Sequence, residues 1–200
     1  MAGALRGDRE SAVPCGGCTA CCTSSQFVHI APDETDTLAH IPAVLLFPAP
    51  GLPDGHLLLG YDERGHCPML VESRCTIYEH RPRTCRTYDC RVFAAAGIDV
   101  DDADKAQVAQ RVRRWRFSYE DESGLVRHAA VRAAADFLVE HPDVLPGEPA
   151  ALSATERAVL AVEMHGAFLD AGPDGAEVLR VPEPEPDAVR AELTRVASNQ

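Results

Sequence analysis

The spacing of hydrophobic positions changes near residue 100, and the change predicts two different kinds of structure in one chain. Before that point the apolar runs are short and are separated by proline and glycine, which is typical of short strands and turns. After it, alanine-rich segments repeat their apolar residues at helical spacing. The expected fold class is therefore α+β, a small irregular module followed by a helical C-terminal half.

In the front part, residues 42–55 contain four prolines and two glycines and therefore predict a loop. Cys67-Pro-Met-Leu-Val is the expected hairpin partner of the strand before it. Pro82 suits the first turn of a short helix that carries Cys85. The other expected elements are strands over 27–30 and 56–61, a helix from Pro32 to about His40, and a strand or turn over 75–78.

In the back part, the strongest signal is Ser153-Ala-Thr-Glu156, whose residue types and spacing match a helical capping box. A run of alternating proline and glutamate over 182–186 predicts a stiff acidic linker. Helices are expected over 104–117, 124–140, 153–172 and 187–197. The predicted organisation is a flexible tail over 1–14, a cysteine module over 15–97, a helical region over 98–180, and the linker with a terminal helix over 181–200.

Charge and composition narrow the classes of protein. The net charge of −12 argues against a surface that binds nucleic acid, and the arginines around Trp115 are expected to form a solvated helix face. Residues 1–14 lack the apolar core of a signal peptide, and the apolar run over 43–47 is too short to span a bilayer. We therefore expect a cytoplasmic protein that is not embedded in a membrane.

All eight cysteines lie in the first ninety residues, at positions 15, 18, 21, 22, 67, 75, 85 and 90. A reducing cytosol makes metal binding a more natural use of them than disulfides, although an even number also suits a disulfide framework. Cys15, Cys18 and Cys21 follow one another at the interval used by three ligands of a bacterial ferredoxin run, and Cys67 precedes a proline as the remote ligand does there. In an extended backbone, adjacent Cys21 and Cys22 would point in different directions.

The spacing alone leaves the metal open. Zinc and iron–sulfur clusters both accept four thiolates, and eight thiols could fill two sites or one cluster with spare cysteines. We expect the ligands to come from Cys15, Cys18, Cys21, Cys22, Cys67, Cys75, Cys85 and Cys90. The expected cofactor is an iron–sulfur cluster, of the four-iron type, with zinc as the alternative.

The chain resembles the YkgJ-like cysteine-cluster family, named for its Cys-x-x-Cys-x-x-Cys-Cys signature and described as zinc- or iron-chelating. The resemblance covers residues 15–90 and rests on four motifs, with Asp89 standing where proline is expected. These motifs are Cys15 to Cys22, Cys67-Pro-Met-Leu, Cys75-Thr-Ile-Tyr78 and Glu79-His-Arg81-Pro82-Arg-Thr-Cys85-Arg86-Thr-Tyr88-Asp-Cys90.

The motifs and the resemblance together leave three functions open. The first is a metal-binding protein with a redox, sensing or accessory role. The second follows from larger relatives named flagellin lysine N-methylases, which are thought to hold an iron–sulfur cluster. This chain lacks a glycine-rich strand-to-helix turn that could seat S-adenosylmethionine. The third is a zinc-stapled module whose helices bind an unidentified protein partner.

Arginines crowd the third cysteine segment, and Arg81 and Arg86 match the family motif. Guanidinium groups there would offset thiolate charge and donate hydrogen bonds to sulfur, or alternatively line an anion pocket. Tyr78 and Tyr88 flank the segment and are expected mainly to pack against it. His66 and His80 could each replace a cysteine as a ligand, although eight thiols make this unnecessary.

Overall fold

The computed structural model describes residues 17–100, 103–145, 152–172 and 175–198. Within them the chain forms two compact units. We call the first the cysteine unit; its described residues are 17–89, 100 and 103–111. The helical unit comprises 90–99 and the described residues from 112 onward. The mixed α+β class expected from the sequence is confirmed.

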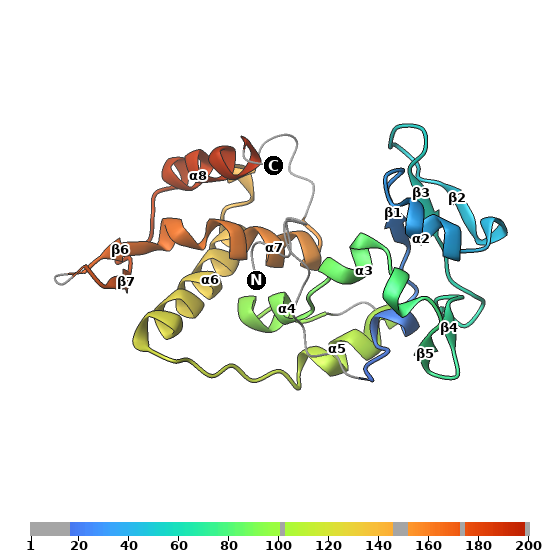
Figure 1. The fold of residues 1–200 in the computed structure, drawn as a ribbon. Coiled ribbons are helices and arrows are strands. Elements are labelled where there is room, and N and C mark those ends of the chain that lie inside the picture. Colours follow the sequence, from blue (N-terminus) through green and yellow to red (C-terminus); the bar gives the residue numbers. More distant parts are fainter. Residues whose placement is uncertain (1–16, 101–102, 146–151, 173–174, 199–200) are drawn as a thin grey trace. The chain divides into compact units, whose positions relative to one another are not determined.

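A three-stranded antiparallel sheet forms one part of the cysteine unit (Figure 1). The central strand is β3 (Leu57–Leu59), with β1 (Val28–Ile30) on one side and β2 (Leu46–Pro48) on the other. Leu59 lies opposite both Val28 and Leu46. The strands expected near 27–30 and 56–61 are confirmed. The loop expected over 42–55 is wrong in part because β2 lies inside it, and its proline is tolerated at the end of an edge strand.

A second, two-stranded sheet pairs β4 (Leu70–Val71) with β5 (Arg74–Cys75). Glu72 and Ser73 between them have positive φ angles of 47° and 60°, the conformation that a two-residue hairpin turn requires. The expectation that residues 67–71 pair with 56–61 is therefore wrong. The local turn takes that strand, while β3 pairs with two more distant segments.

Short helices complete the cysteine unit, and two of them match the sequence expectation. The helix expected to end near His40 is α2, and the one expected to carry Cys85 is α3. A helix expected over 104–117 is shorter, since α5 ends at Val112. The helical elements are η1 (Cys21–Thr23), α2 (Thr35–His40), η2 (Ala43–Leu45), η3 (Tyr78–His80), α3 (Arg83–Thr87), η4 (Ala103–Lys105) and α5 (Ala106–Val112), whose last residue belongs to the helical unit.

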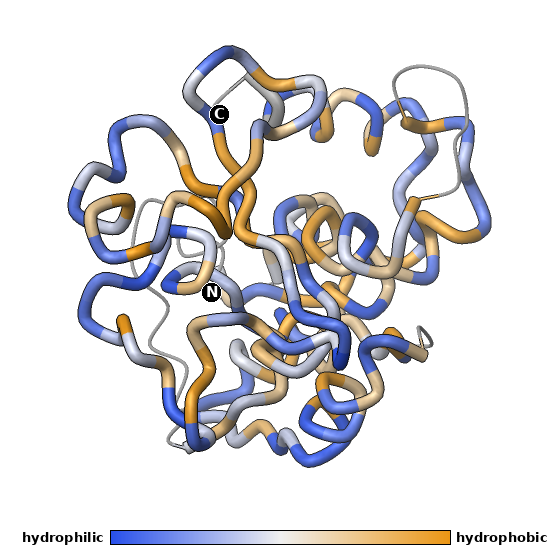
Figure 2. Tube along the Cα trace, turned by 90° about the vertical axis from the view of Figure 1, so that its right-hand side faces the viewer, coloured by the Kyte–Doolittle hydropathy of each residue, from blue (hydrophilic) through white to orange (hydrophobic). Residues whose placement is uncertain are grey.

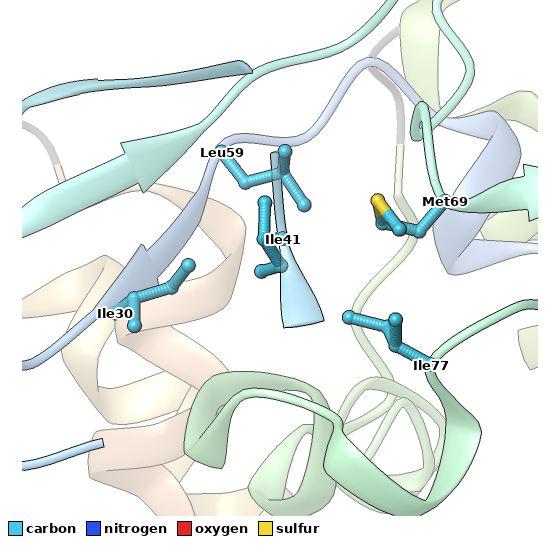
Figure 3. Close-up of a cluster of buried hydrophobic side chains, with 5 residues drawn as sticks. All are labelled: Ile30, Ile41, Leu59, Met69 and Ile77. Atoms are coloured by element: carbon cyan, nitrogen blue, oxygen red, sulfur yellow. The ribbon is translucent and has the colours of Figure 1, made fainter. Parts of the chain in front are cut away.

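Five buried side chains form the core of the cysteine unit and point toward one another (Figure 3). They are Ile30, Ile41, Leu59, Met69 and Ile77. Burying a side chain of this kind contributes about 1.5–3 kcal/mol. Cys67 and Cys75 pack against this core, so the apolar interior and the thiols are parts of one local structure.

In the helical unit, α4 (Arg91–Ala96), α6 (Glu122–Glu140) and α7 (Ala154–Met164) pack together through small and apolar residues. Phe137 meets Phe168 edge-on, with ring centroids 5.5 Å apart. The other elements are η5 (Pro142–Val144), η6 (His165–Phe168), β6 (Leu169–Ala171), β7 (Glu177–Leu179) and α8 (Pro186–Ser198).

In this unit the starts of the helices match the sequence expectations, whereas the end of one helix does not. Ser153 and Glu156 form the expected capping box, with each side chain accepting a backbone N–H of the other residue. The helix expected over 153–172 ends at Met164, because β6 pairs with β7 as a hairpin. The terminal helix expected over 187–197 is confirmed as α8.

Hydrophobic and hydrophilic residues alternate along the helices in short stretches (Figure 2). No helix among the described residues combines the length and the apolar character needed to cross a membrane.

Candidate metal centre

Five described cysteines influence one another electrostatically within the cysteine unit. Cys22 interacts with the thiols of Cys18, Cys67 and Cys75. Cys85 in turn interacts with Cys22, Cys67 and Cys75. The seven described cysteines are all free thiols. Residues far apart in the sequence thus form one group of sulfurs, which we call the thiol cluster: Cys18, Cys22, Cys67, Cys75 and Cys85.

Backbone hydrogen bonds fix the first cysteine segment to the second. The N–H of Cys67 donates to the carbonyl of Cys22 at 2.8 Å, and the N–H of Ser25 donates to the carbonyl of Gly65 at 2.8 Å. Gly65 has a φ of +77°, and a Cβ there would meet the Ser25 hydroxyl oxygen at 2.2 Å. The contact between the two segments therefore requires glycine at position 65, and it places Cys22 beside Cys67.

Asp62 shapes the turn that leads to Cys67. Its Oδ1 accepts the backbone N–H groups of Arg64 and His66, each at 2.9 Å. Those bonds, first that of His66, and the Arg64 side chain lower the pKa of Asp62 to about 2, so its carboxylate is ionised at neutral pH. An aspartate that caps its own turn in this way stabilises a local loop.

The β4–β5 hairpin places the next two thiols. The N–H of Leu70 donates to the carbonyl of Cys67 at 2.9 Å, and Cys75 lies opposite Leu70 in the hairpin. Thr76 donates to the carbonyl of Met69 through both its N–H and its hydroxyl. The tight hairpin therefore returns Cys75 toward Cys67.

Three hydrogen bonds attach α3, which carries Cys85, to the β1–α2 region. Buried Glu34 accepts the N–H of Ala31 through Oε1 and the N–H of Arg83 through Oε2. The hydroxyl of Thr84 donates to the carbonyl of His29 at 2.8 Å. Arg83 also pairs with Asp33 at 2.6 Å, at the protein surface. We call these contacts the α3 clamp.

Burial and mutual repulsion raise the pKa of three thiols. Desolvation is the main cause at Cys22, whose pKa rises to about 11, and at Cys85, whose pKa rises to about 12 although the residue as a whole is exposed. Desolvation also raises the pKa of Cys67, against backbone hydrogen bonds to its sulfur. These three thiols therefore hold their protons at neutral pH, and a cation that displaces the protons would offset the repulsion between the thiolates that form.

Arg81 is a positively charged side chain that acts on the thiol cluster. Its charge lowers the pKa of both Cys22 and Cys85, opposing the larger effect of burial. Its guanidinium carbon lies 3.6 Å from the centre of the Tyr78 ring. The Arg81 Nε is buried and has no hydrogen-bond partner among the described residues. A buried donor of this kind fits a negatively charged group bound by the thiols.

The other residues expected around the cysteines have the following surroundings. Arg86 acts electrostatically on Asp36, whose pKa its charge helps to lower. Tyr78 is exposed on one side and covered by Arg81 on the other. Tyr88 is half-buried just after α3, with its N–H donating to the carbonyl of Thr84. Asp89, at the position where proline was expected, is buried.

The remaining three cysteines do not belong to the thiol cluster as defined above. Cys15 lies outside the described residues. Cys21 is exposed, whereas its neighbour Cys22 is half-buried, so the two adjacent thiols have different surroundings. Cys90 belongs to the helical unit, where its sulfur accepts the indole N–H of Trp115 at 3.2 Å.

Sequence reasoning missed two residues that build the site, Glu34 and Asp62, which the sequence analysis did not single out. Acids and proline before α2, and Asp62-Glu-Arg-Gly65 before Cys67, are the local signals that could have pointed to them. The long-range bond from Arg83 to Glu34 has no sequence signal of its own.

Comparison with known proteins agrees with this chemistry. Residues 14–111 match the family model CxxCxxCC, whose description is "putative zinc- or iron-chelating domain". Neither the curated proteins nor the solved structures yield a significant match to the chain.

Proposed function

Because residues 14–111 belong to the CxxCxxCC family of zinc- or iron-chelating domains, we propose that this chain binds an iron–sulfur cluster in a reducing compartment. The proposed ligands are Cys22, Cys67, Cys75 and Cys85, with Cys18 beside them. Four thiolates are a complete ligand set for a four-iron cluster. When bound, such a cluster supplies one-electron redox chemistry, which suits an electron-transfer or sensing role.

The spacing of Cys15, Cys18 and Cys21, which is that of three ligands of a bacterial ferredoxin run, carries the choice of a cluster over zinc, and the separation of the described sulfurs supports it. Among the described residues, only Asp36, His40 and His80 bring three ligand-type atoms within 4.8 Å of one another. No three described cysteine sulfurs are that close. A tetrahedral zinc site, with zinc–sulfur bonds near 2.3 Å, would place its sulfurs about 3.8 Å apart. A cluster keeps its cysteine ligands farther apart because iron and sulfide lie between them.

Arg81 also supports the proposal. A cluster with four thiolates carries net negative charge, and hydrogen bonds to its sulfurs tune its potential. The buried Nε of Arg81 is a donor available for such a bond. The nearby Tyr78 ring holds the guanidinium from its other side and restricts its position.

Two matched serine variants test the proposed ligand set. Cys85→Ser should abolish the cluster, measured as iron and acid-labile sulfide per chain after anaerobic purification. Cys90→Ser, which changes a cysteine of the helical unit, should leave both at the level of the unmodified protein. Loss of the cluster in Cys90→Ser, or its retention in Cys85→Ser, would show that the ligand set is different.

A further inference from the structure

Outside the thiol cluster, the cysteine unit gathers two imidazoles and a carboxylate at the contact of α2 with η3. One ligand-type atom each from Asp36, His40 and His80 lies within 4.8 Å of the other two. Asp36 and His40 belong to α2, and His80 ends η3. The two imidazole rings are stacked, with centroids 3.5 Å apart and planes 7° from parallel.

Asp36 fixes the tautomer of both rings in the neutral state. The Nδ1 of His40 lies 2.8 Å from the Asp36 carbonyl oxygen, and the Nδ1 of His80 lies 2.8 Å from the Asp36 Oδ2. Both oxygens can only accept, so each Nδ1 carries the proton and donates it. An ion bound by the Asp36 carboxylate and both rings would take the place of these Nδ1 protons, and each ring would then carry its proton on Nε2.

The Asp36 carboxylate faces both rings, with its Oδ1 3.8 Å from His40 Nδ1 and its Oδ2 2.8 Å from His80 Nδ1. Arg86 also acts on this carboxylate and is the positive charge that an ion would have to tolerate. Two imidazole rings and a carboxylate together form a donor set for a divalent ion. Asp36 and His40 are exposed, which gives an ion direct access from solvent.

A second histidine pair in the same unit provides the comparison. His29 and His56 are joined through His29 Nε2 and His56 Nδ1 at 2.8 Å, with ring centroids 5.1 Å apart. In this pair, one nitrogen of each ring is occupied by the hydrogen bond to the other ring. It also has no third ligand-type atom within 4.8 Å among the described residues. The pair at α2 and η3 therefore differs from it in having a carboxylate that faces both rings.

We propose that His40, His80 and Asp36 form a second metal site, which takes one divalent first-row transition ion through imidazole nitrogen and carboxylate oxygen. Its donor types suit Ni²⁺, Zn²⁺ or Fe²⁺ and differ from the soft thiolates of the cluster. Three protein donors leave coordination positions open to water. A bound ion would also connect α2 to η3 and so stabilise the unit.

Equilibrium dialysis against Ni²⁺ tests the site in the full chain with its cysteine site loaded. The unmodified protein should bind one additional Ni²⁺ per chain. His40→Ala and His80→Ala should each weaken that binding by more than the ~10- to 100-fold that follows loss of an outer partner. Asp36→Asn should weaken it by about tenfold or more. His56→Ala, the matched control, should bind Ni²⁺ as the unmodified protein does.

Iron and sulfide are measured in the same samples, so that failure of the second site can be told from failure of the proposed cluster. Substitutions at the second site should leave the iron and sulfide contents unchanged. The histidine variants change surface residues, and circular dichroism checks that they remain folded. As a second readout, Ni²⁺ should broaden the NMR signals of the His40 and His80 rings before those of His29 and His56. No additional Ni²⁺, an equal amount in the His40→Ala and His80→Ala variants, or first broadening at His29 and His56 would overturn the proposal.

Discussion

At the scale of single residues, three thiols of the cluster hold protons that a bound metal has to displace. The pKa of Cys22 is about 11 and that of Cys85 about 12, and the pKa of Cys67 is also raised. A thiol with a pKa well above the ambient pH binds metal only after releasing its proton. Apparent affinity must therefore rise as the pH rises and fall as it falls.

We predict that Zn²⁺, used as a probe ion on the metal-free protein, will release about four protons per ion bound. Calorimetry in buffers of different ionisation enthalpy measures this number directly. The apparent affinity should increase steeply between about pH 6 and pH 8, since each protonated ligand adds to the dependence. Binding with fewer than two protons released would mean that the thiols are already ionised and would contradict the raised pKa values.

Arg81 should stabilise the bound cluster without binding it as a ligand. Arg81→Ala should lower retention of the cluster by ~10- to 100-fold and make its reduction potential more negative, because a positive charge that favours the reduced state is lost. Arg81→Lys should restore only part of the effect, since lysine lacks the planar fork.

Arg86→Ala is the comparison variant for Arg81, because the charge of Arg86 acts on Asp36, whereas the charge of Arg81 acts on Cys22 and Cys85. Voltammetry on both variants provides the comparison. An equal shift of potential in Arg86→Ala would show that both guanidinium groups tune the cluster alike.

Residue identity was predictable from the sequence to the extent that the chemistry is local. The cysteine spacing indicated which side chains are candidate metal ligands, and the surroundings of Cys18, Cys22, Cys67, Cys75 and Cys85 are compatible with that expectation. The particular groups on which Arg81 and Arg86 act were not predictable, because both residues match the same motif. Arg81 follows η3 and acts on Cys22 and Cys85, whereas Arg86 lies in α3 and acts on Asp36.

At the scale of elements, the α3 clamp is the contact that holds a cysteine-bearing helix in place. Helix α3 has five residues and is too short to be stable alone, so its position depends on Glu34, Thr84 and Arg83. The clamp thus joins the β1–α2 region to Cys85.

Glu34→Ala should lower the free energy of unfolding by about 2 kcal/mol or more, because it leaves the N–H groups of Ala31 and Arg83 without their carboxylate acceptor. The same variant should retain less iron, since Cys85 loses its support. Chemical denaturation and iron analysis measure the two effects. Asp33→Asn, which weakens only the exposed pair with Arg83, should change neither. Equal losses in the two variants would contradict a specific role of the buried carboxylate.

The elements that sequence analysis predicted correctly are those with local signals. The capping box of α7 and the proline before α3 belong to this class. The elements it missed or misplaced depend on partners distant in the sequence. Strand β2 exists because β3 pairs with it, and residues 70–71 pair with Arg74–Cys75 because a two-residue turn brings them together. The hairpin of β6 and β7 likewise replaces an expected helix end.

At the scale of the whole molecule, the two units should depend on metal to different extents. The cysteine unit has a small apolar core, two sheets of short strands and many loops, so metal binding should contribute much of its folding free energy. The helical unit packs α4, α6 and α7 through buried apolar residues.

Complete removal of metal by a chelator should therefore increase hydrogen exchange in β1 and β3 far more than in α6 and α7. Mass spectrometry of exchanged fragments reports both units in one experiment. The single tryptophan, Trp115, lies in the helical unit and gives a fluorescence probe of that part. Unchanged protection of β1 and β3 after complete metal removal would show that the cysteine unit folds without metal.

The central claim is that the thiol cluster binds iron and sulfide rather than a single zinc ion. The most direct test is the iron, acid-labile sulfide and zinc content of the anaerobically purified full chain, measured with its visible absorption spectrum. The account predicts a brown protein with about four iron and four sulfide per chain and little zinc. A colourless protein with one zinc per chain and no sulfide would contradict it.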